Sequence, residues 1–127
     1  MKNSLLIVDD SITTLKWLRQ ILKREGYDVL EASNGKEGLR LCHQEWVDLV
    51  ITDLIMPDKE GLETIMELRR DFPHVPIIAM SGGGRISPEE YLYLAKKLGA
   101  QHTLCKPFTR QEILRAIRDV LDKGLEL

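Results

Sequence analysis

Apolar residues in this chain gather in short runs, separated by segments with a helical repeat. The runs at 5–8, 49–51 and 77–80 show no alternation of apolar and polar side chains, which is typical of strands buried on both faces of a sheet. Short segments at 27–31 and 103–105 predict two further strands. The hydrophobic pattern alone therefore predicts five strands.

The segments between these runs carry apolar residues three and four positions apart, which predicts five amphipathic helices. Ser11, Ser87 and Thr109 stand where N-caps are expected, and Gly26 and Gly99 stand where helices are expected to end. The residues expected to face the core are Ile12, Leu15, Leu18 and Leu22 in the first helix, Leu39, Cys42, His43 and Trp46 in the second (after a turn at Asn34-Gly35), Leu62, Ile65, Met66 and Leu68 in the third (over 61–71), Tyr91, Leu92, Ala95 and Leu98 in the fourth, and Ile113, Leu114, Ile117, Val120 and Leu121 in the fifth.

Strict alternation of strand and helix predicts an α/β fold with a parallel sheet, helices on both of its faces and right-handed crossovers. No linker or internal boundary interrupts the pattern, so residues 1–127 are expected to form a single domain. The last helix is expected to end near Gly124, and no helix-turn-helix module for DNA is expected after it.

Composition narrows the function. The chain is 43% hydrophobic and 30% charged, as in an ordinary globular domain. Its net charge of −2 lacks the basic footprint of direct nucleic-acid binding, and no segment is long and apolar enough to span a membrane. Cys42 and Cys105 make neither a disulfide framework nor a zinc site. We therefore expect a cytoplasmic protein in a reducing setting.

Polar side chains stand at the ends of four of the predicted strands. Asp9 and Asp10 follow the first strand, Asp53 ends the third, Ser81 ends the fourth and Lys106 ends the fifth. The carboxyl ends of parallel strands lie at one edge of a sheet, where α/β folds place their ligands. Any one of these residues alone suits a helix cap, a turn or a surface charge, but together they predict one site.

The chemistry that this set favours is phosphoryl transfer. Three carboxylates in a small space repel one another and call for a cation, and oxygen ligands favour a hard ion such as Mg²⁺ over zinc. A carboxylate beside Mg²⁺ can attack a phosphoryl group and form an acyl phosphate. Lys106 would supply a fixed positive charge, Ser81 a hydroxyl donor, and the small Gly82 room for the phosphoryl group.

At these residues the sequence resembles a known family, the response-regulator receiver domains of two-component signalling. The matching stretches are Leu-Ile-Val-Asp-Asp-Ser at 6–11, Asp-Leu-Ile-Met-Pro-Asp at 53–58 with Gly61, Ser81-Gly82, and Leu-Cys-Lys-Pro-Phe-Thr at 104–109. They extend over the whole chain, and as a set they are highly specific. The resemblance implies a doubly wound (βα)5 flavodoxin-like fold, with a five-stranded parallel sheet in the order 2-1-3-4-5.

The resemblance also implies a role for each site residue. Asp53 would be the phosphoacceptor, taking its phosphoryl group from a histidine kinase or a histidine phosphotransfer protein. Ser81 would be the switch hydroxyl and Lys106 the counter-ion of the phosphoryl group, with a bond from Lys106 to Pro107 that is typically cis. Such a domain catalyses only its own phosphorylation and dephosphorylation, so we expect no enzyme acting on other substrates.

The metal site follows from the same resemblance. Mg²⁺ would be bound directly by Asp10, Asp53 and the backbone carbonyl of Ile55. Asp9 would act mostly through a metal-bound water. No other cofactor is implied.

One position departs from the family pattern. Receivers commonly carry an aromatic switch residue three positions before the lysine, and Thr103 stands there. His102 is not in register to replace it, since adjacent strand residues point to opposite faces. The phosphoacceptor chemistry does not depend on this position, but the usual coupled movement of hydroxyl and aromatic ring does. The glycines at 82–84 suit either a loop that closes over the phosphorylated site or a merely mobile connection.

The resemblance implies an output surface made by the fourth helix, the fifth strand and the fifth helix. This surface would bind a downstream protein effector or a second copy of the domain. Tyr93, Lys96, Lys97 and Arg118 are exposed candidates there, or members of an ordinary solvated face. Trp17 belongs either to a kinase-docking patch on the first helix or to the edge of the core.

Three alternatives fit the same fold. A phosphohydrolase of the haloacid dehalogenase type would use an aspartate nucleophile, but it needs a second acid two positions further on, where this chain has Ile55. A flavin or nucleotide binder fits the sheet order, but the run Gly82–Gly84 lacks a G-x-G-x-x-G or Gly-Lys-Ser/Thr pattern. A phosphorylation-independent docking module would not need the complete set of acids, hydroxyl and lysine.

Overall fold

The computed structural model describes residues 2–54, 61–82 and 87–123. Strands and helices alternate along this part of the chain, as the hydrophobic pattern predicts. The elements are β1 (Ser4–Val8), α1 (Ile12–Arg24), β2 (Asp28–Ala32), α2 (Gly35–Gln44), β3 (Leu49–Asp53), α3 (Gly61–Asp71), β4 (Ile77–Ser81), α4 (Pro88–Leu98), β5 (His102–Cys105) and α5 (Arg110–Lys123). Predictions that concern Ile55, the glycines at 83 and 84, the side chain of Tyr91 and Gly124 lie outside the described residues.

All strands of the sheet are parallel, and their order is β2-β1-β3-β4-β5. β1 pairs with both β2 and β3, so the winding of the chain reverses direction beside β1. Such a reversal opens a crevice at the carboxyl ends of the strands, which is where ligands bind in folds of this kind. The predicted flavodoxin-like order is confirmed.

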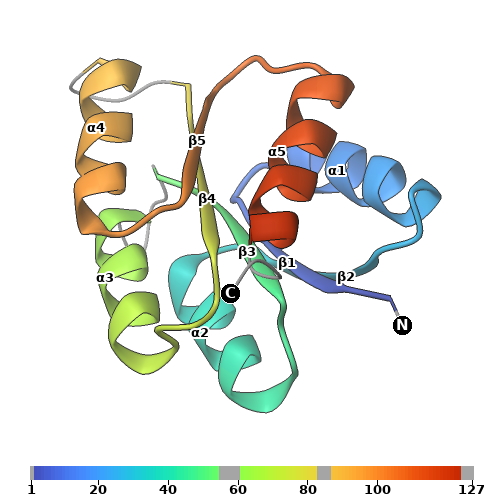
Figure 1. The fold of residues 1–127 in the computed structure, drawn as a ribbon, viewed down its shortest axis with the longest axis horizontal. Helices are drawn as coiled ribbons and strands as arrows, with labels where there is room; N and C mark the ends of the chain where they lie inside the picture. The colour runs from blue at the N-terminus through green and yellow to red at the C-terminus, as the bar shows by residue number, and fades with distance from the viewer. Residues whose placement is uncertain (1, 55–60, 83–86, 124–127) are drawn as a thin grey trace.

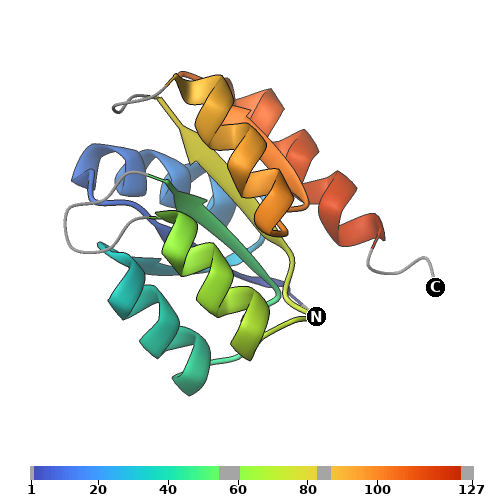
Figure 2. The same cartoon turned by 90° about the vertical axis from the view of Figure 1, so that its left-hand side faces the viewer.

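Helices cover both faces of the sheet. α1 and α5 lie on one side, and α2, α3 and α4 lie on the other (Figure 1). Figure 2 shows α3 between α2 and α4. Because successive strand residues point to opposite faces, Leu5 and Ile7 of β1 join one core while Leu6 and Val8 join the other. Both faces are buried, which explains why the strands show no polar–apolar alternation. No described helix has the length and apolar character needed to cross a membrane.

Four residues predicted to face the core are exposed, and those predictions were wrong. Ile12 is 72% exposed because it begins α1 at the carboxyl edge of the sheet, and Trp46 is 79% exposed because α2 ends before it. Met66 is 54% exposed and His43 is also exposed, because each lies beside the buried stripe of its helix. In α3 that stripe consists of Gly61, Thr64, Ile65 and Leu68.

Side-chain caps fix the starts of α1, α2, α4 and α5. Asn34 and Gly35 were predicted to form a turn, but Asn34 caps α2 and Gly35 begins it. Asn34 Oδ1 accepts a hydrogen bond from the N–H of Glu37 at 2.9 Å. A cap of this kind satisfies a backbone donor that has no partner inside the helix. The predicted N-caps are confirmed at Ser11, Ser87 and Thr109.

Gly99 ends α4 in the left-handed region, with a φ of 118°. A Cβ atom there would lie 2.5 Å from Cδ of Arg69 on α3. The guanidinium of Arg69 donates through Nη2 to the carbonyl oxygens of Phe72, at 3.4 Å, and Val75. One arginine therefore closes the connection from α3 to β4 and also lies beneath the C-terminal end of α4.

Gly61 packs directly on the backbone at the end of β3. A Cβ atom at this position would lie 2.3 Å from Cα of Leu54 and 2.4 Å from the carbonyl oxygen of Asp53. The N–H of Gly61 also donates to the carbonyl of Leu54 at 2.9 Å. Backbone atoms in a sheet cannot rotate away as a side chain can, so only glycine lets α3 begin this close to Asp53.

We expect Gly61→Ala to lower the free energy of unfolding by about 1–3 kcal/mol, the usual cost of overpacking. Urea denaturation followed by circular dichroism measures the change. The matched control is Gly38→Ala in α2, which gains helix propensity. Its Cβ would meet only side-chain atoms, the nearest being Cγ2 of Val8 at 3.0 Å. Equal midpoints for the two variants would show that the close approach at Gly61 is no constraint.

Candidate functional site

The polar residues that follow the strands meet at the carboxyl edge of the sheet. The N–H of Asp9 donates to the carbonyl of Ala32 at 3.1 Å, which carries the pairing of β1 with β2 one residue further. In the same way, the N–H of Lys106 donates to the carbonyl of Ser81 at 2.8 Å. Asp53 is itself the last residue of β3. The sheet therefore fixes the backbones of the site.

Three carboxylates converge at this edge. One oxygen from each of Asp9, Asp10 and Asp53 lies within 4.8 Å of the others. Asp9 is fully buried, Asp53 is 6% exposed, and Asp10 is exposed to solvent. Like charges at such separations disfavour one another's ionised forms, so the cluster calls for a cation.

The ammonium group of Lys106 lies against two of these acids. Its Nζ donates to Asp9 Oδ2 at 2.7 Å and lies 3.5 Å from Asp53 Oδ1. The other oxygen of Asp9 accepts the N–H of Ser11 at 2.9 Å. Asp10 has no hydrogen-bond or ion-pair partner within the described part of the chain. The cluster therefore holds three carboxylates and one lysine, so the site keeps an excess of negative charge.

Burial raises the pKa of Asp53 to about 6, from an ordinary value of 3.8. The charge and hydrogen bond of Lys106 lower this pKa, and the charge of Asp9 raises it, but the loss of water around the carboxyl group is the largest effect. Burial also acts to lower the pKa of Lys106. Its hydrogen bond to Asp9 and the charges of both acids outweigh that effect, so the pKa of Lys106 is raised and the lysine stays charged.

Ser81 brings an unsatisfied hydroxyl to the site. Its side chain is fully buried, and its Oγ has no hydrogen-bond partner among the residues that the structure describes. A buried polar group without a partner is costly, so the site holds a donor that a ligand can satisfy. Next to it, a Cβ atom on Gly82 would lie 2.7 Å from Cβ of Lys106. Gly82 therefore makes room for the lysine stem, a packing reason that the sequence interpretation did not contain.

Thr103 lies apart from this cluster. It pairs in register with Ala79 of β4, while its neighbour Leu104 belongs to the core beneath α1 and α5. Thr103 instead faces α4, where it lines a shallow hollow of about 390 Å³ together with Glu89, Leu92, Tyr93, Lys96 and Lys97. The bond between Lys106 and Pro107 is cis, as the resemblance implies.

Two contacts of the site were missed by sequence reasoning. The ion pair between Lys106 and Asp9 joins residues 97 positions apart, a separation that no local pattern reveals. Thr52 is fully buried and donates its hydroxyl to the carbonyl of Asp53 at 3.0 Å. The sequence feature that could have indicated this contact is a polar residue inside an otherwise apolar strand. The hydrogen bond holds the backbone of Asp53 in place.

The donor set fits a hard cation such as Mg²⁺. Its side-chain ligands are carboxylate oxygens, which Mg²⁺ prefers to nitrogen or sulfur. Mg²⁺ usually keeps several waters and binds one or two carboxylates. The exposed Asp10 gives such an ion access from solvent, and the buried Asp53 gives it a second carboxylate.

The fold and the site together define a signalling domain of the receiver class. The chain belongs to this family, because residues 5–118 match the response regulator receiver domain. The general function of the family is to accept a phosphoryl group within two-component signalling, and its members generally bind Mg²⁺ in an acidic pocket. Its members interact with histidine kinases and effector domains.

Individual relatives agree with this assignment. The chain is 39% identical, over 94% of its length, to a probable transcriptional regulator, ycf27, of Guillardia theta, and covers 46% of that protein. The structure of a CheY-like receiver domain protein from Methanospirillum hungatei JF-1 matches 99% of this chain and 98% of its own, with a TM-score of 0.92 and 29% identity. A receiver domain protein from Clostridium thermocellum matches with a TM-score of 0.89 and 34% identity, covering 98% and 99% of the two chains. The chain spans about half or less of the length of the first curated relatives that it matches.

The raised pKa of Asp53 predicts that its ionisation weakens the fold. The pKa of this carboxyl group is higher in the folded than in the unfolded state, so its protonated form favours folding. The resulting stabilisation is complete below about pH 4 and is lost as the pH rises through about 6. In metal-free buffer near pH 7, Asp53→Asn should therefore raise the free energy of unfolding by about 1–3 kcal/mol. The gain should disappear near pH 4, and urea denaturation across this pH range measures it.

The matched control is Asp28→Asn, which removes one negative charge from an exposed position at the start of β2. A gain that is equal in the two variants, or that does not change with pH, would contradict the burial of an ionised Asp53 as its cause.

Proposed function

We propose that Asp53 accepts a phosphoryl group from the phosphohistidine of a sensor histidine kinase or a histidine phosphotransfer protein, in a reaction that depends on Mg²⁺. One observation carries this proposal. A nearly buried carboxylate at the end of β3 is surrounded by two further acids, a lysine ammonium group 3.5 Å away and a buried hydroxyl that has no described partner.

In the proposed reaction Asp53 is the nucleophile. One of its oxygens forms a bond to phosphorus while the bond from phosphorus to the imidazole nitrogen breaks, and the nitrogen keeps the electron pair and then binds a proton. The product is an acyl phosphate on Asp53. Such transfers need mainly positioning and neutralisation of charge on the phosphoryl oxygens. Lys106 offers the positive charge and Ser81 the hydroxyl donor.

The acids would hold the metal ion. Asp10 is exposed and has no described partner, so its oxygens are free to bind Mg²⁺ beside Asp53. Both oxygens of Asp9 already accept hydrogen bonds, which supports an indirect role through a water molecule. When bound, Mg²⁺ would neutralise negative charge on the phosphoryl group. The carbonyl of Ile55 stays a predicted ligand.

Exposed apolar side chains beside the site suit the docking of the donor protein. Ile12, two positions after Asp10, is 72% exposed at the start of α1. Trp17 is 38% exposed on the same helix and packs against Phe108, with ring centroids 5.7 Å apart. Apolar surface next to a reactive group is typical of a protein contact. We therefore propose that the kinase or phosphotransfer protein binds at this exposed part of α1, around Ile12 and Trp17.

Phosphorylation would be read at α4, β5 and α5, by a downstream effector or a second copy of the domain. Tyr93, Lys96, Lys97 and Arg118 are exposed there, and the ammonium of Lys97 lies 5.5 Å from the Tyr93 ring centroid. With Thr103 on β5, the aromatic side chain lining the adjacent hollow is Tyr93 of α4. We therefore propose that phosphorylation is sensed through a change in α4 itself, and not through an aromatic side chain on β5.

The domain would act on no substrate other than its own aspartate. Ile55 stands where a phosphohydrolase of the haloacid dehalogenase type needs an acid, which favours a switch over an enzyme. Cys42 and Cys105 are free thiols, which supports a reducing, cytoplasmic location.

With acetyl phosphate and Mg²⁺, the wild-type protein should gain one phosphoryl group, and Asp53→Ala should gain none because the nucleophile is absent. Intact-mass spectrometry measures the gain, and chelation of Mg²⁺ should abolish it. Asp28→Ala is the matched control and should be modified like the wild type. A wild type that stays unmodified, or an Asp53→Ala variant modified to the same extent, would refute the proposal.

Phosphorylation should change amide hydrogen exchange in α4, β5 and α5 while leaving α2 unaffected. Exchange is measured by mass spectrometry on protein with and without acetyl phosphate, after its modification is verified. Ser81→Ala should still be phosphorylated but should lose the change in α4, because the hydroxyl that would move toward the phosphoryl group is missing. Phosphorylated wild-type protein with unchanged exchange over residues 82–120 would exclude this output surface.

A further inference from the structure

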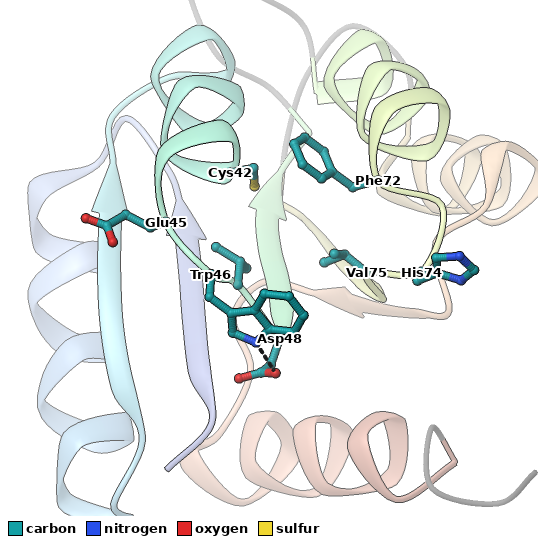
Figure 3. A pocket seen from close by; sticks show the side chains of 8 residues that line it. Cys42, Glu45, Trp46, Asp48, Phe72, His74 and Val75 are labelled. Atoms are coloured by element: carbon teal, nitrogen blue, oxygen red, sulfur yellow. Dashed lines mark hydrogen bonds between the residues drawn. The ribbon is translucent and has the colours of Figure 1, made fainter. Parts of the chain in front are cut away.

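A second hollow lies at the edge of the sheet opposite the phosphoacceptor site. Its volume is about 230 Å³, and it lies between the connection from α2 to β3 and the connection from α3 to β4 (Figure 3). We call it the basal pocket. The strand Leu49–Asp53 runs from this pocket to the site, a distance of about 16 Å for five extended residues. The lining residues are Cys42, Glu45, Trp46, Val47, Asp48, Phe72, His74 and Val75.

Trp46 forms one wall of the basal pocket although it is 79% exposed. Its Nε1–H donates to Asp48 Oδ1 at 2.9 Å (Figure 3). The other oxygen of Asp48 accepts the N–H of Ser4 at 2.7 Å. The carboxylate that holds the start of β1 therefore also orients the indole ring. An exposed tryptophan that is already ordered loses little freedom when a partner covers it, which is typical of a binding hot spot.

The rest of the basal pocket is largely apolar. Cys42, Phe72 and Val75 border the same open space as the indole of Trp46 (Figure 3). Burial raises the pKa of the Cys42 thiol to about 11, so this side chain is a neutral packing group. The pocket is smaller than the range of about 300–1,000 Å³ that small-molecule sites usually have. Its size therefore suits one side chain of a partner better than a cofactor.

The charge of the basal pocket indicates which side chain that is. Asp48 brings a carboxylate to the lining, and Glu45 borders the pocket with its carboxylate directed away from the open space (Figure 3). The described lining contains no lysine or arginine. Neither acid has an ion-pair partner within the described part of the chain. A cationic side chain would thus meet an aromatic wall and uncompensated negative charge together.

We propose that the basal pocket binds an arginine side chain of a partner protein. The guanidinium group would stack on the indole of Trp46 near the carboxylate of Asp48, and its alkyl stem would lie against Phe72 and Val75. Glu45 would add negative charge at the border of the pocket. A guanidinium is planar and more weakly hydrated than an ammonium group, so an aromatic wall favours arginine over lysine. Because the pocket is remote from the phosphoacceptor site, this contact would tether the partner in both phosphorylation states.

The test uses the peptide acetyl-Leu-Arg-Leu-amide and the same peptide with citrulline, which keeps the shape of arginine and loses its charge. NMR titration of ¹⁵N-labelled protein should show shifts of the Trp46 indole N–H and of the backbone amides of Cys42, Phe72 and Val75. The arginine peptide should bind about threefold to thirtyfold more tightly than the citrulline peptide. Equal binding of the two peptides, or no shift of these signals, would overturn the proposal.

Two variants complete the test. Trp46→Ala should weaken binding of the arginine peptide about tenfold or more, with thermal unfolding little changed because the indole is exposed. Trp17→Phe alters the only other tryptophan of the chain and should bind like the wild type. Glu45→Gln should weaken binding at low salt, while Glu63→Gln, an exposed acid in the first turn of α3, should not.

Three outcomes would overturn the proposal. A Trp46→Ala variant that binds the peptide like the wild type would exclude the indole as the docking wall. Self-association of the wild type that Trp46→Ala removes would assign the pocket to a second copy of the chain. An affinity that changes after treatment with acetyl phosphate and Mg²⁺ would contradict a tether that is independent of phosphorylation.

Discussion

The functional edge of this domain depends on the contact of one ammonium group with two of three clustered carboxylates. Lys106 pairs with the fully buried Asp9 and lies within reach of Asp53. A buried charge without a partner is strongly destabilising, so the lysine compensates an acid that the fold could not otherwise hold there. The compensation is incomplete, and what remains is an affinity for further positive charge. The same imbalance that costs stability therefore prepares the site for a metal ion.

Several packing constraints serve this arrangement. Gly82 leaves space for the stem of Lys106, and Gly61 lets α3 begin against the backbone of Asp53. Thr52 and Ser81 are polar residues buried in strands that are otherwise apolar. Natural proteins break the local rules of folding mainly at functional sites. Here the exceptions gather at one edge of the sheet, while the strand interiors obey the rules.

The strands, the helices and the parallel sheet could be predicted from the sequence because the patterns that specify them are local. Uninterrupted apolar runs and helical spacing specify strands and helices, and their alternation specifies a parallel sheet. The site was predictable for the same reason. Asp9 and Lys106 each follow a strand, Asp53 and Ser81 each end one, and parallel strands end at one edge of the sheet. The strand order itself rested on the resemblance to a known family, since periodicity does not reveal which strands are neighbours.

Two kinds of feature could not be predicted from the sequence: where each helix ends relative to the sheet, and contacts between segments far apart in the chain. The pattern predicts which side of a helix is apolar, but not that Ile12 lies beyond the supporting sheet or that α2 ends before Trp46. The pairing of Lys106 with Asp9 and the basal pocket each join segments far apart in the chain. Such contacts follow from tertiary packing, which a single sequence does not display.

The arginine beneath Gly99 has a mechanical consequence for α4. The guanidinium group of Arg69 donates hydrogen bonds to the connection from α3 to β4, and its alkyl stem packs beneath Gly99, the C-cap of α4. The other end of α4 begins at the Ser87 cap, on the side of the sheet where Ser81 lies. The contact of Arg69 at Gly99 restrains the C-terminal end of α4, so a displacement of this helix would be larger at its first turn.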